Sequence, residues 1–293
     1  MGHTAPLGST LGRGSWRVEG ADAAGADAAG AVRGVRGTGR LGYREAVPET
    51  SDATPIQFRS DMTVELVRSS AHDSDVLFAA RVSTQGEKTL EAAASGADAS
   101  DRDRGLINFL MRDRHGSPFE HNSMTFYVQA PIFVFREFMR HRIASYNEES
   151  GRYRELRPVF YVPGPERRLV QQGKPGAYEF VAGTPEQTAL AVAESKAAAE
   201  FAYAAYQRML DAGVAREVAR GVLPVSTYSS MYVTMNSRSL MNFLSLRTKH
   251  PDSHFPSFPQ REIEMVAERM EALWAELMPL THAAFQANGR VAP

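Results

Sequence analysis

Arginine is concentrated in one short part of the sequence, where its side chains could bind an anion. Six arginines and a single histidine lie between Arg136 and Arg157, a stretch that contains no lysine. Guanidinium groups hold phosphate oxygens in pairs, and Ser150-Gly151 offers a hydroxyl and a backbone N–H to the same group. The residues alone leave two interpretations open, a polyanion site or a solvated charged face, because only four of the 33 basic residues are lysines.

The overall composition restricts the chemistry that the chain can perform. It has 293 residues, a net charge of −1 and no cysteine, and this charge argues against a protein built to coat nucleic acid. Without cysteine there is no disulfide, thiolate zinc site or cysteine nucleophile, and we expect a cytoplasmic location. We expect no membrane contact either, because no apolar run approaches the roughly 18 residues of a membrane span.

Histidine and serine residues offer two further kinds of site. His115 and His121 are six positions apart, which does not suit two ligands on one helix face, so no metal site is predicted. His121 is interpreted as a buried, hydrogen-bonded histidine. Ser150 could act as a nucleophile only with a base in reach, and substrate binding is the favoured interpretation.

Periodic patterns place these residues in a single α+β domain over residues 56–293. Strand patterns lie in the first part of 61–83 and in 124–130, 158–166 and 227–234. Helical patterns lie in the second part of 61–83 and in 106–111, 132–144, 184–212, 214–221, 237–246 and 262–286. Residues 85–102 are predicted as a loop or short helix, and residues 170–184 as a loop. This order predicts a mixed or antiparallel sheet flanked by long helices, with Thr184 as the N-cap of the longest one and Arg140–Arg142 closing another.

The first 55 residues differ from the rest. Residues 1–42 hold 11 of the 23 glycines and eight alanines, and their few large apolar residues follow no sustained period. Such a segment cannot bury enough apolar surface to offset its chain entropy. We therefore predict a disordered low-complexity tail over residues 1–55.

Four blocks of the sequence resemble those of the flavin-dependent thymidylate synthases. Arg140-His-Arg, followed by seven residues and Ser150, is similar to the signature of that family. His115-Gly-Ser-Pro-Phe-Glu-His resembles its upstream block, Arg216-Glu-Val-Ala-Arg-Gly-Val-Leu-Pro its middle block, and the segment from Asn236 to Arg247 its C-terminal block. The blocks stand in the order of the family, so the chain is identified as a member.

The resemblance implies an activity. The family converts dUMP to dTMP, takes the carbon from methylenetetrahydrofolate, and uses NADPH to reduce a tightly bound FAD. Its members are homotetramers with active sites at subunit junctions. A chain without cysteine cannot attack the uracil ring with a thiolate, so the resemblance implies activation by arginine electrostatics and reduction by a flavin hydride.

The resemblance also implies roles for individual residues. Arg247 is the implied catalytic residue, whose planar guanidinium beside N3 of uracil stabilises negative charge on the ring. The implied FAD contacts are Ser117, Arg140, His141, Arg142, Glu148, Asn236, Ser237, Arg238 and Asn242. The implied dUMP contacts are Glu137, Phe138, Met139, Arg140, Glu148, Glu149, Ser150, Gly151, Arg152, Arg220 and Arg247, with Ser150 and Arg152 suited to the phosphate.

Other interpretations of the same residues stay open. An arginine-rich nucleic-acid-binding module could stack bases on Tyr146, Tyr153 and Tyr161, and a flavin-dependent reductase could share the cofactor without transferring a methyl group. Asn242 could be a satisfied polar group of its helix, and Arg238 could pair with a carboxylate.

One segment departs from the family pattern. The residues from Phe255 to Pro259 form an insert relative to shorter family members, so the contacts of folate and NADPH are not predicted.

Overall fold

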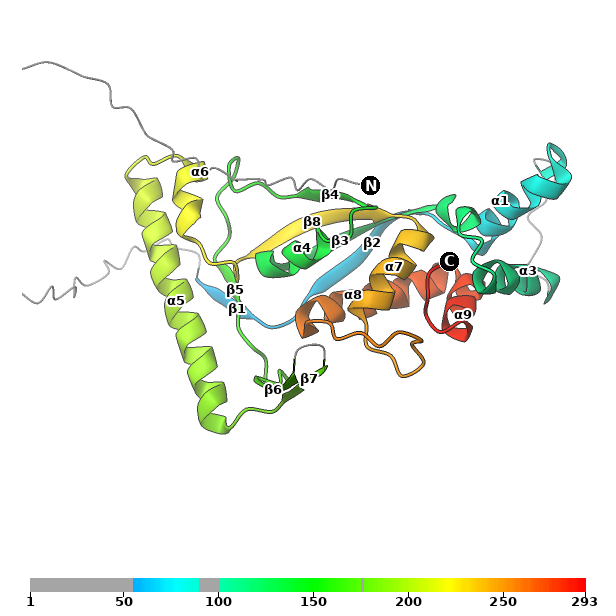
Figure 1. Cartoon of the computed structure of the whole chain (residues 1–293). Helices are drawn as coiled ribbons and strands as arrows, with labels where there is room; N and C mark the ends of the chain where they lie inside the picture. Colours follow the sequence, from blue (N-terminus) through cyan, green and yellow to red (C-terminus); the bar gives the residue numbers. More distant parts are fainter. Residues whose placement is uncertain (1–54, 90–100, 175–176) are drawn as a thin grey trace, which may run out of the picture. The chain divides into compact units, whose positions relative to one another are not determined.

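The computed structural model describes residues 55–89, 101–174 and 177–293 (Figure 1). The prediction of a disordered tail over residues 1–55 therefore concerns residues that, apart from Pro55, lie outside the described part of the chain. The described residues form the α+β arrangement that the sequence predicts, with helices packed against an antiparallel sheet.

A four-stranded antiparallel sheet forms the centre. Its strands are β2 (Thr63–Ser70), β3 (Ser123–Pro131), β8 (Tyr228–Met235) and β4 (Ser145–Glu148), in the order β2-β3-β8-β4. Side chains of a strand point alternately to the two faces, and on β3 the apolar residues Met124, Phe126, Val128 and Ala130 are all buried on one of them. The sequence pattern at 124–130 thus determines which face of the sheet carries the core.

Helices cover this buried face. The helices α4 (Ile132–Phe138), α7 (Ser237–Arg247) and α8 (Arg261–Leu277) contribute to one hydrophobic core with the strands, as Figure 1 shows in front of the sheet. The helices α1 (Asp73–Gln85), α3 (Asp101–Arg112) and α9 (Pro279–Ala287) contact one another near the C-terminus, and the short η1 (Ser117–Glu120) contacts α1 and α7.

A smaller core lies around the long helix α5 (Pro185–Asp211). Phe160, Ala199, Tyr203, Tyr206 and Ala219 are buried together there. The parallel pair β1 (Gln57–Arg59) and β5 (Val159–Tyr161) and the short helices α6 (Arg216–Ala219) and η2 (Arg220–Val222) complete it. The predicted N-cap of α5 is confirmed, because the Thr184 hydroxyl accepts a hydrogen bond from the Gln187 N–H at 3.2 Å.

Three details of the predicted elements are wrong. Residues 170–184, predicted as a loop, contain the antiparallel hairpin of β6 (Val170–Lys174) and β7 (Ala177–Val181). The predicted helix over 262–286 is two helices, since Met278 ends α8 and Pro279, which has no N–H to continue a helix, starts α9. The strand β4 lies inside the arginine-rich segment, where no strand is predicted.

A fourth difference, at the end of α4, affects the site directly. The helix predicted over 132–144 ends at Phe138, so Arg140, His141 and Arg142 follow α4 instead of closing it. The Tyr146 hydroxyl lies 2.9 Å from the carbonyl oxygen of Phe138, which also accepts from the His141 N–H at 2.8 Å, and 2.6 Å from the carbonyl oxygen of His141. It therefore binds the backbone that follows the last turn of α4. Among the described residues, no helix has both the length and the apolarity needed to cross a membrane.

Candidate active site

Arg247 lies where the C-terminal ends of α4 and α7 meet. Its Nη1 contacts the Glu137 carboxylate at 2.5 Å, and its Nε donates to Nε2 of His141 at 3.0 Å. A longer contact of 3.4 Å joins its Nη2 to the carbonyl oxygen of Glu137. Only 12% of the Arg247 side chain is exposed. Three of the residues implied by the family resemblance are therefore brought together, and the guanidinium is held by contacts at three nitrogens.

His141 is neutral in this arrangement. Burial, and next the neighbouring Arg247 guanidinium, lower the pKa of His141 to about 4, although Glu137 opposes the shift. Because the Arg247 N–H is the donor, Nε2 of His141 must be the unprotonated nitrogen, and Nδ1 carries the proton. The imidazole thus accepts from Arg247 at neutral pH without adding a positive charge.

Two aromatic residues that were not predicted as site residues hold this junction. The ring of Phe243 stacks on Phe138 with centroids 4.9 Å apart, and it meets His141 edge-on at 4.9 Å. Tyr146, which the sequence suggested only as a base-stacking residue, binds the backbone at the end of α4. Burial raises the pKa of Tyr146 to about 12, so its hydroxyl stays a donor.

A second group of implied residues lies at the end of β4. Burial raises the pKa of Glu148, against a hydrogen bond from Ser229 and the attraction of Arg220. A β-carbon on the buried Gly151 would stand 3.2 Å from the Arg220 stem and 3.0 Å from Leu156, so only glycine fits this corner without displacing a neighbour. The Ser150 hydroxyl accepts from the Arg152 N–H at 3.2 Å, which shapes the corner.

Two arginines of this corner form surface ion pairs. Arg152 Nε contacts Glu217 at 2.8 Å, and Arg154 Nη1 lies 3.4 Å from Glu149. The side chains of Arg152 and Glu217 are each 53% exposed. Exposed pairs of this kind contribute little to stability, so a phosphate group can replace the carboxylate at small cost. These local Glu–Arg pairs fit the solvated charged face that was one of the two interpretations of the arginine cluster.

A third group lies at the first turn of α7. The Asn236 side chain accepts from the Ser239 N–H at 2.9 Å and caps the helix. Ser237 is fully buried, and both its N–H and its hydroxyl lie 2.8 Å from Oδ1 of Asn122. Arg238 contacts Glu120 at 2.5 Å and the Pro293 carbonyl oxygen at 2.6 Å. The side-chain oxygen of Asn236 and both donors of Ser237 are thus used in the fold, and Arg238 has the carboxylate partner that was one interpretation of it.

Two other implied FAD contacts are exposed near this turn. Ser117 begins η1, next to Gly116, and Asn242 lies on α7 with its amide nitrogen 3.2 Å from the carbonyl oxygen of Arg238. A β-carbon on Gly116 would stand 2.5 Å from the Arg238 guanidinium carbon. Gly116 is therefore the residue that lets Arg238 lie flat against the η1 turn.

Met139, Arg140 and Arg142 are exposed after the end of α4. Within the described part of the chain, neither Arg140 nor Arg142 makes a side-chain hydrogen bond or ion pair. FAD carries a diphosphate, and guanidinium groups without a carboxylate partner are the donors that a diphosphate needs. Their guanidinium groups are therefore available to an anion, whereas the hydroxyl of Ser237 already has partners within the fold.

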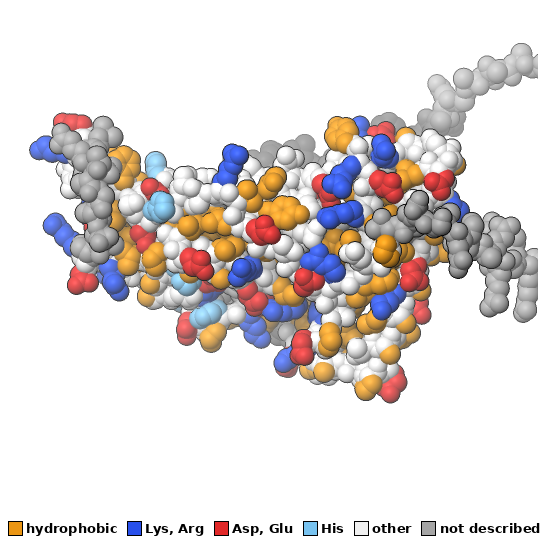
Figure 2. Space-filling model, turned by 180° about the vertical axis from the view of Figure 1, so that it is seen from behind, with side chains coloured by type: hydrophobic (Ala, Val, Ile, Leu, Met, Phe, Trp, Pro, Cys, Tyr) orange, Lys and Arg blue, Asp and Glu red, His pale blue; other side chains and the backbone are white. Residues whose placement is uncertain are grey.

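The remaining predictions concern histidines and charge. His121 is exposed, so its interpretation as a buried histidine is wrong; it follows the short η1 at the surface. Among the described residues, no three His, Asp or Glu side chains are grouped so that they could hold a metal ion. Figure 2 shows blue and red side chains interspersed on the face turned away in Figure 1, without the single basic patch that nucleic-acid binding would favour.

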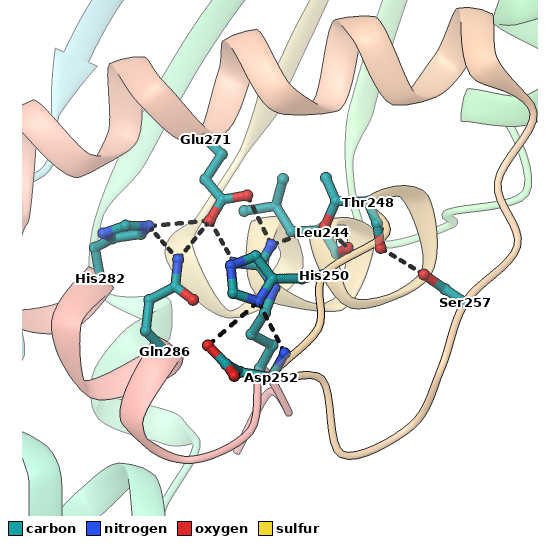
Figure 3. Close-up of polar contacts among 9 residues, drawn as sticks. Leu244, Thr248, His250, Asp252, Ser257, Glu271, His282 and Gln286 are labelled. Carbon is teal, nitrogen blue, oxygen red and sulfur yellow. Dashed lines mark hydrogen bonds and ion pairs between the residues drawn. The ribbon is translucent and has the colours of Figure 1, made fainter.

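One polar cluster beside the site has no counterpart in the sequence analysis. It joins Thr248, the residue after Arg247, to Glu271 on α8 and to Arg290 after α9, with His282 and Gln286 at its far side (Figure 3). The only sequence signal for it is the isolated arginine near the C-terminus, because no periodic pattern connects segments so far apart in the chain.

Comparisons with known proteins agree on one family. The family model described as "Thymidylate synthase complementing protein" matches residues 65–280. A flavin-dependent thymidylate synthase from Streptomyces coelicolor is 68% identical over 244 residues, which are 83% of this chain and 98% of the relative. The corresponding protein from Tropheryma whipplei is 62% identical over 236 residues, 80% of this chain and 97% of the relative.

Solved structures agree as well. The chain is similar to a UMP/dUMP methylase, PolB from Streptomyces cacaoi, in its structures with 5-Br UMP and with 5-Br dUMP. The sequence identity is 58%, and the TM-scores are 0.74 and 0.76. The matches cover 82% and 81% of this chain and the whole of the other.

Proposed function

The chain belongs to the family of flavin-dependent thymidylate synthases, and from this membership we propose that it methylates dUMP to dTMP. The carbon comes from methylenetetrahydrofolate, and FAD, reduced by NADPH, supplies the hydride. The chain has no cysteine, so no thiolate of its own adds to the uracil ring. Its own residues therefore bind the nucleotide and stabilise the charge that develops on the ring.

Arg247 is the proposed catalytic residue. Methylation at C5 needs a uracil ring that is electron-rich at that carbon, and a guanidinium beside N3 and O2 stabilises the negative charge that spreads over the ring. The single observation that carries this role is the anchoring of Arg247 by Glu137 and His141 at 2.5 and 3.0 Å. A guanidinium held in this way needs no reorganisation when the charge appears.

The proposed phosphate site of dUMP is the corner of Ser150, Gly151 and Arg152, with Arg220 beside it. Ser150 and Gly151 offer a hydroxyl and a backbone N–H, and the weak pair between Arg152 and Glu217 leaves a guanidinium that an anion can take over. The other proposed nucleotide contacts are Glu137, Phe138, Met139, Arg140, Glu148 and Glu149.

Arg140 and Arg142 are proposed to hold the diphosphate of FAD. Support comes from their exposure and from their lack of a side-chain partner among the described residues. His141, Glu148, Ser117, Arg238 and Asn242 stay proposed flavin contacts. Asn236 and Ser237 are proposed to act through the fold of α7, whose first turn they hold.

Product formation tests the proposal. Purified protein loaded with FAD, given NADPH, methylenetetrahydrofolate and dUMP labelled with tritium at C5, should release tritium and form dTMP. Arg247→Ala should lower kcat by a factor of about 10² to 10³, the loss typical of one electrostatic donor, while FAD stays bound. A yellow, NADPH-reducible protein that makes no dTMP would be a reductase, and a colourless protein that binds RNA or DNA would be the alternative module; either outcome contradicts the proposal.

UMP is the second candidate substrate. The similarity to a UMP/dUMP methylase at 58% identity favours including it, whereas the relatives at 68% identity are thymidylate synthases. We expect kcat/KM to be higher for dUMP than for UMP in parallel assays. The reverse order would make the chain a UMP methylase.

The assembly and the location are also proposed. We propose a homotetramer with active sites at subunit junctions, supported by the exposed apolar side chains Leu190 and Phe201 on α5, which are 61% and 75% exposed. A cytoplasmic location stays a prediction from the sequence.

A further inference from the structure

We propose that Arg290, held by Glu271, is a positioning residue that fixes Thr248 and through it the guanidinium of Arg247. The inference rests on the proposed function of Arg247. It concerns a cluster that lies outside the four sequence blocks of the family resemblance, apart from Arg247 itself.

Arg290 links two elements through one guanidinium. Its Nη1 and Nη2 meet the two carboxylate oxygens of Glu271 at 2.6 and 2.7 Å, and Nη2 also donates to the Thr248 hydroxyl at 2.7 Å. Only 2% of Arg290 is exposed. A two-pronged pair is geometrically specific, so the position of Glu271 on α8 determines where the third contact of Arg290, the Thr248 hydroxyl, lies.

Thr248 is held on every polar atom that it has. Its N–H and its hydroxyl donate to the Leu244 carbonyl oxygen at 3.0 and 2.7 Å, its hydroxyl accepts from Arg290, and its carbonyl oxygen accepts from the Ser257 hydroxyl at 2.5 Å. Thr248 ends α7 immediately after Arg247. Movement of Thr248 would therefore move the backbone from which the Arg247 side chain extends.

Glu271 is itself fixed. His282 Nε2 and Gln286 Nε2 lie 3.0 and 3.1 Å from its Oε1, on the side away from Thr248, as Figure 3 shows. Burial would raise the pKa of Glu271, but the hydrogen bonds of Arg290 and His282 outweigh it and hold the pKa at about 2. The carboxylate thus stays charged at every pH at which the enzyme works. We call the linked residues Glu271, Arg290 and Thr248 the brace, because together they hold the end of α7 in place.

The backbone at Arg290 is unusual in a way that points to a role beyond packing. Arg290 has φ of 57°, in the left-handed region that residues other than glycine rarely adopt, and Gly289 before it has φ of 69°. The backbone is held there by bonds from Arg290 N–H to the Phe285 carbonyl and from His254 N–H to the Gly289 carbonyl, at 2.9 and 2.8 Å. Strained residues gather where geometry serves a function, and a buried ion pair is seldom the most stable way to fill a core.

The direct test removes the hydroxyl of Thr248 and keeps the side-chain shape. Thr248→Val should lower kcat for dTMP formation on the order of 10- to 100-fold, the effect expected when a catalytic group shifts by up to an ångström. The FAD content and the NADPH-driven reduction of the flavin should stay at wild-type levels. Thr248→Ser, which keeps the hydroxyl, should retain kcat within about twofold of wild type.

A matched control separates positioning from stability. Thr281→Val makes the same substitution at another buried threonine, whose hydroxyl donates to Asp73 at 2.6 Å and has no contact with the cluster, so it should lower Tm about as much as Thr248→Val and leave kcat unchanged. If Thr248→Val keeps the wild-type kcat, or if Thr281→Val lowers kcat equally, the cluster only stabilises the fold and the inference is overturned.

A second measurement keeps this inference distinct from the proposed function. Wild-type protein that makes no dTMP would overturn the function alone. Hydrogen exchange by mass spectrometry, which needs no activity, should then still show faster exchange at the end of α7 in Thr248→Val and unchanged exchange there in Thr281→Val. Equal exchange at the end of α7 in all three proteins would overturn the inference that Arg290 positions Thr248, whichever reaction the protein catalyses.

Discussion

At the scale of single residues, the arginines of the site fall into two kinds. Arg247 and Arg290 are largely buried and held by carboxylates at short distances, whereas Arg140 and Arg142 are exposed and have no side-chain partner within the described ranges. The buried arginines are held in position before any ligand binds. The exposed arginines are available to neutralise the negative charge of a ligand. A site for dUMP and FAD, which both carry phosphate, needs both kinds.

The neutral state of His141 can be tested by titration. Its pKa of about 4, below the ordinary 6.5, means that the folded state binds this proton less readily than the unfolded state does. The contribution of His141 to stability is therefore complete above pH 6.5 and is lost as the pH falls through 6.5 toward 4. NMR of ¹³C-labelled histidine, assigned with His141→Gln, should show a midpoint near 4; a midpoint near 6.5 would contradict the hydrogen bond from Arg247.

The contact between Gly116 and Arg238 gives a second prediction. Gly116→Ala would put a β-carbon 2.5 Å from the Arg238 guanidinium carbon, so the flexible arginine must move away from the η1 turn. We expect weaker FAD binding, measured by flavin fluorescence on dilution, with little change in Tm. Gly105→Ala in α3, where a β-carbon meets nothing within 4 Å, is the control and should bind FAD as wild type does. Equal FAD affinity in both variants would contradict the proposed contact between Arg238 and FAD.

At the scale of elements, the end of α4 depends on one hydroxyl. Tyr146→Phe removes the donor to the Phe138 and His141 carbonyls, and we expect a loss of about 1 kcal/mol, or a drop in Tm of about 2–4 °C for a chain of this size. Because His141 contacts Arg247, kcat should fall as well. Tyr153→Phe, at a ring that is 79% exposed, is the matched control. A Tyr146 variant with wild-type Tm and kcat would show that the α4 end is fixed by its neighbours alone.

The sequence predicts elements well where a local signal exists. Thr184 caps α5 and the alternation at 124–130 gives β3, because both signals depend on neighbouring residues. The hairpin of β6 and β7 is missed because its strands are mostly exposed and carry no alternating apolar pattern. The end of α4 at Phe138 is missed because the apolar pattern continues past it, whereas the contacts of the backbone there with Tyr146 belong to no helix pattern.

In the candidate site too, local sequence motifs predict some residues, whereas contacts between distant segments could not be predicted. The family blocks predict Arg247 and the residues from Arg140 to Arg142, and the structure adds the contacts that hold Arg247 and His141. The brace from Thr248 to Arg290 could not be predicted, since its members are 42 positions apart and only the folded chain brings α7 and the C-terminal segment together.

At the scale of the whole molecule, we expect α5 to carry the surface for the proposed assembly. An open groove of about 770 Å³ runs along its N-terminal half, lined mainly by small and apolar residues: Gly183, Pro185, Thr188, Ala189, Val192, Ala193 and Lys196. Leu190 and Phe201 are exposed on the same helix. A helix with so much uncovered apolar surface is typical of a subunit interface.

Light scattering after size-exclusion chromatography tests this prediction. The wild-type protein should have about four times the 32.2 kDa of one chain, and the double variant Leu190→Glu with Phe201→Glu should fall to smaller species and lose activity. Val82→Glu on α1, at a side chain that is 54% exposed, is the control and should keep the wild-type mass. A monomeric active wild type would contradict the tetramer.

The burial of Trp274 gives the molecule a built-in optical probe. Trp274 is fully buried, with its ring 5.3 Å from His282 and 5.8 Å from Phe285, three positions after Glu271 on α8. The other of the two tryptophans, Trp16, lies outside the described residues. An indole excluded from water emits at shorter wavelength than a hydrated one, so a red shift that is absent from a Trp274→Phe variant would signal the opening of this region. The emission spectrum of the unlabelled enzyme can therefore report whether the region around Glu271 on α8 opens while substrates bind.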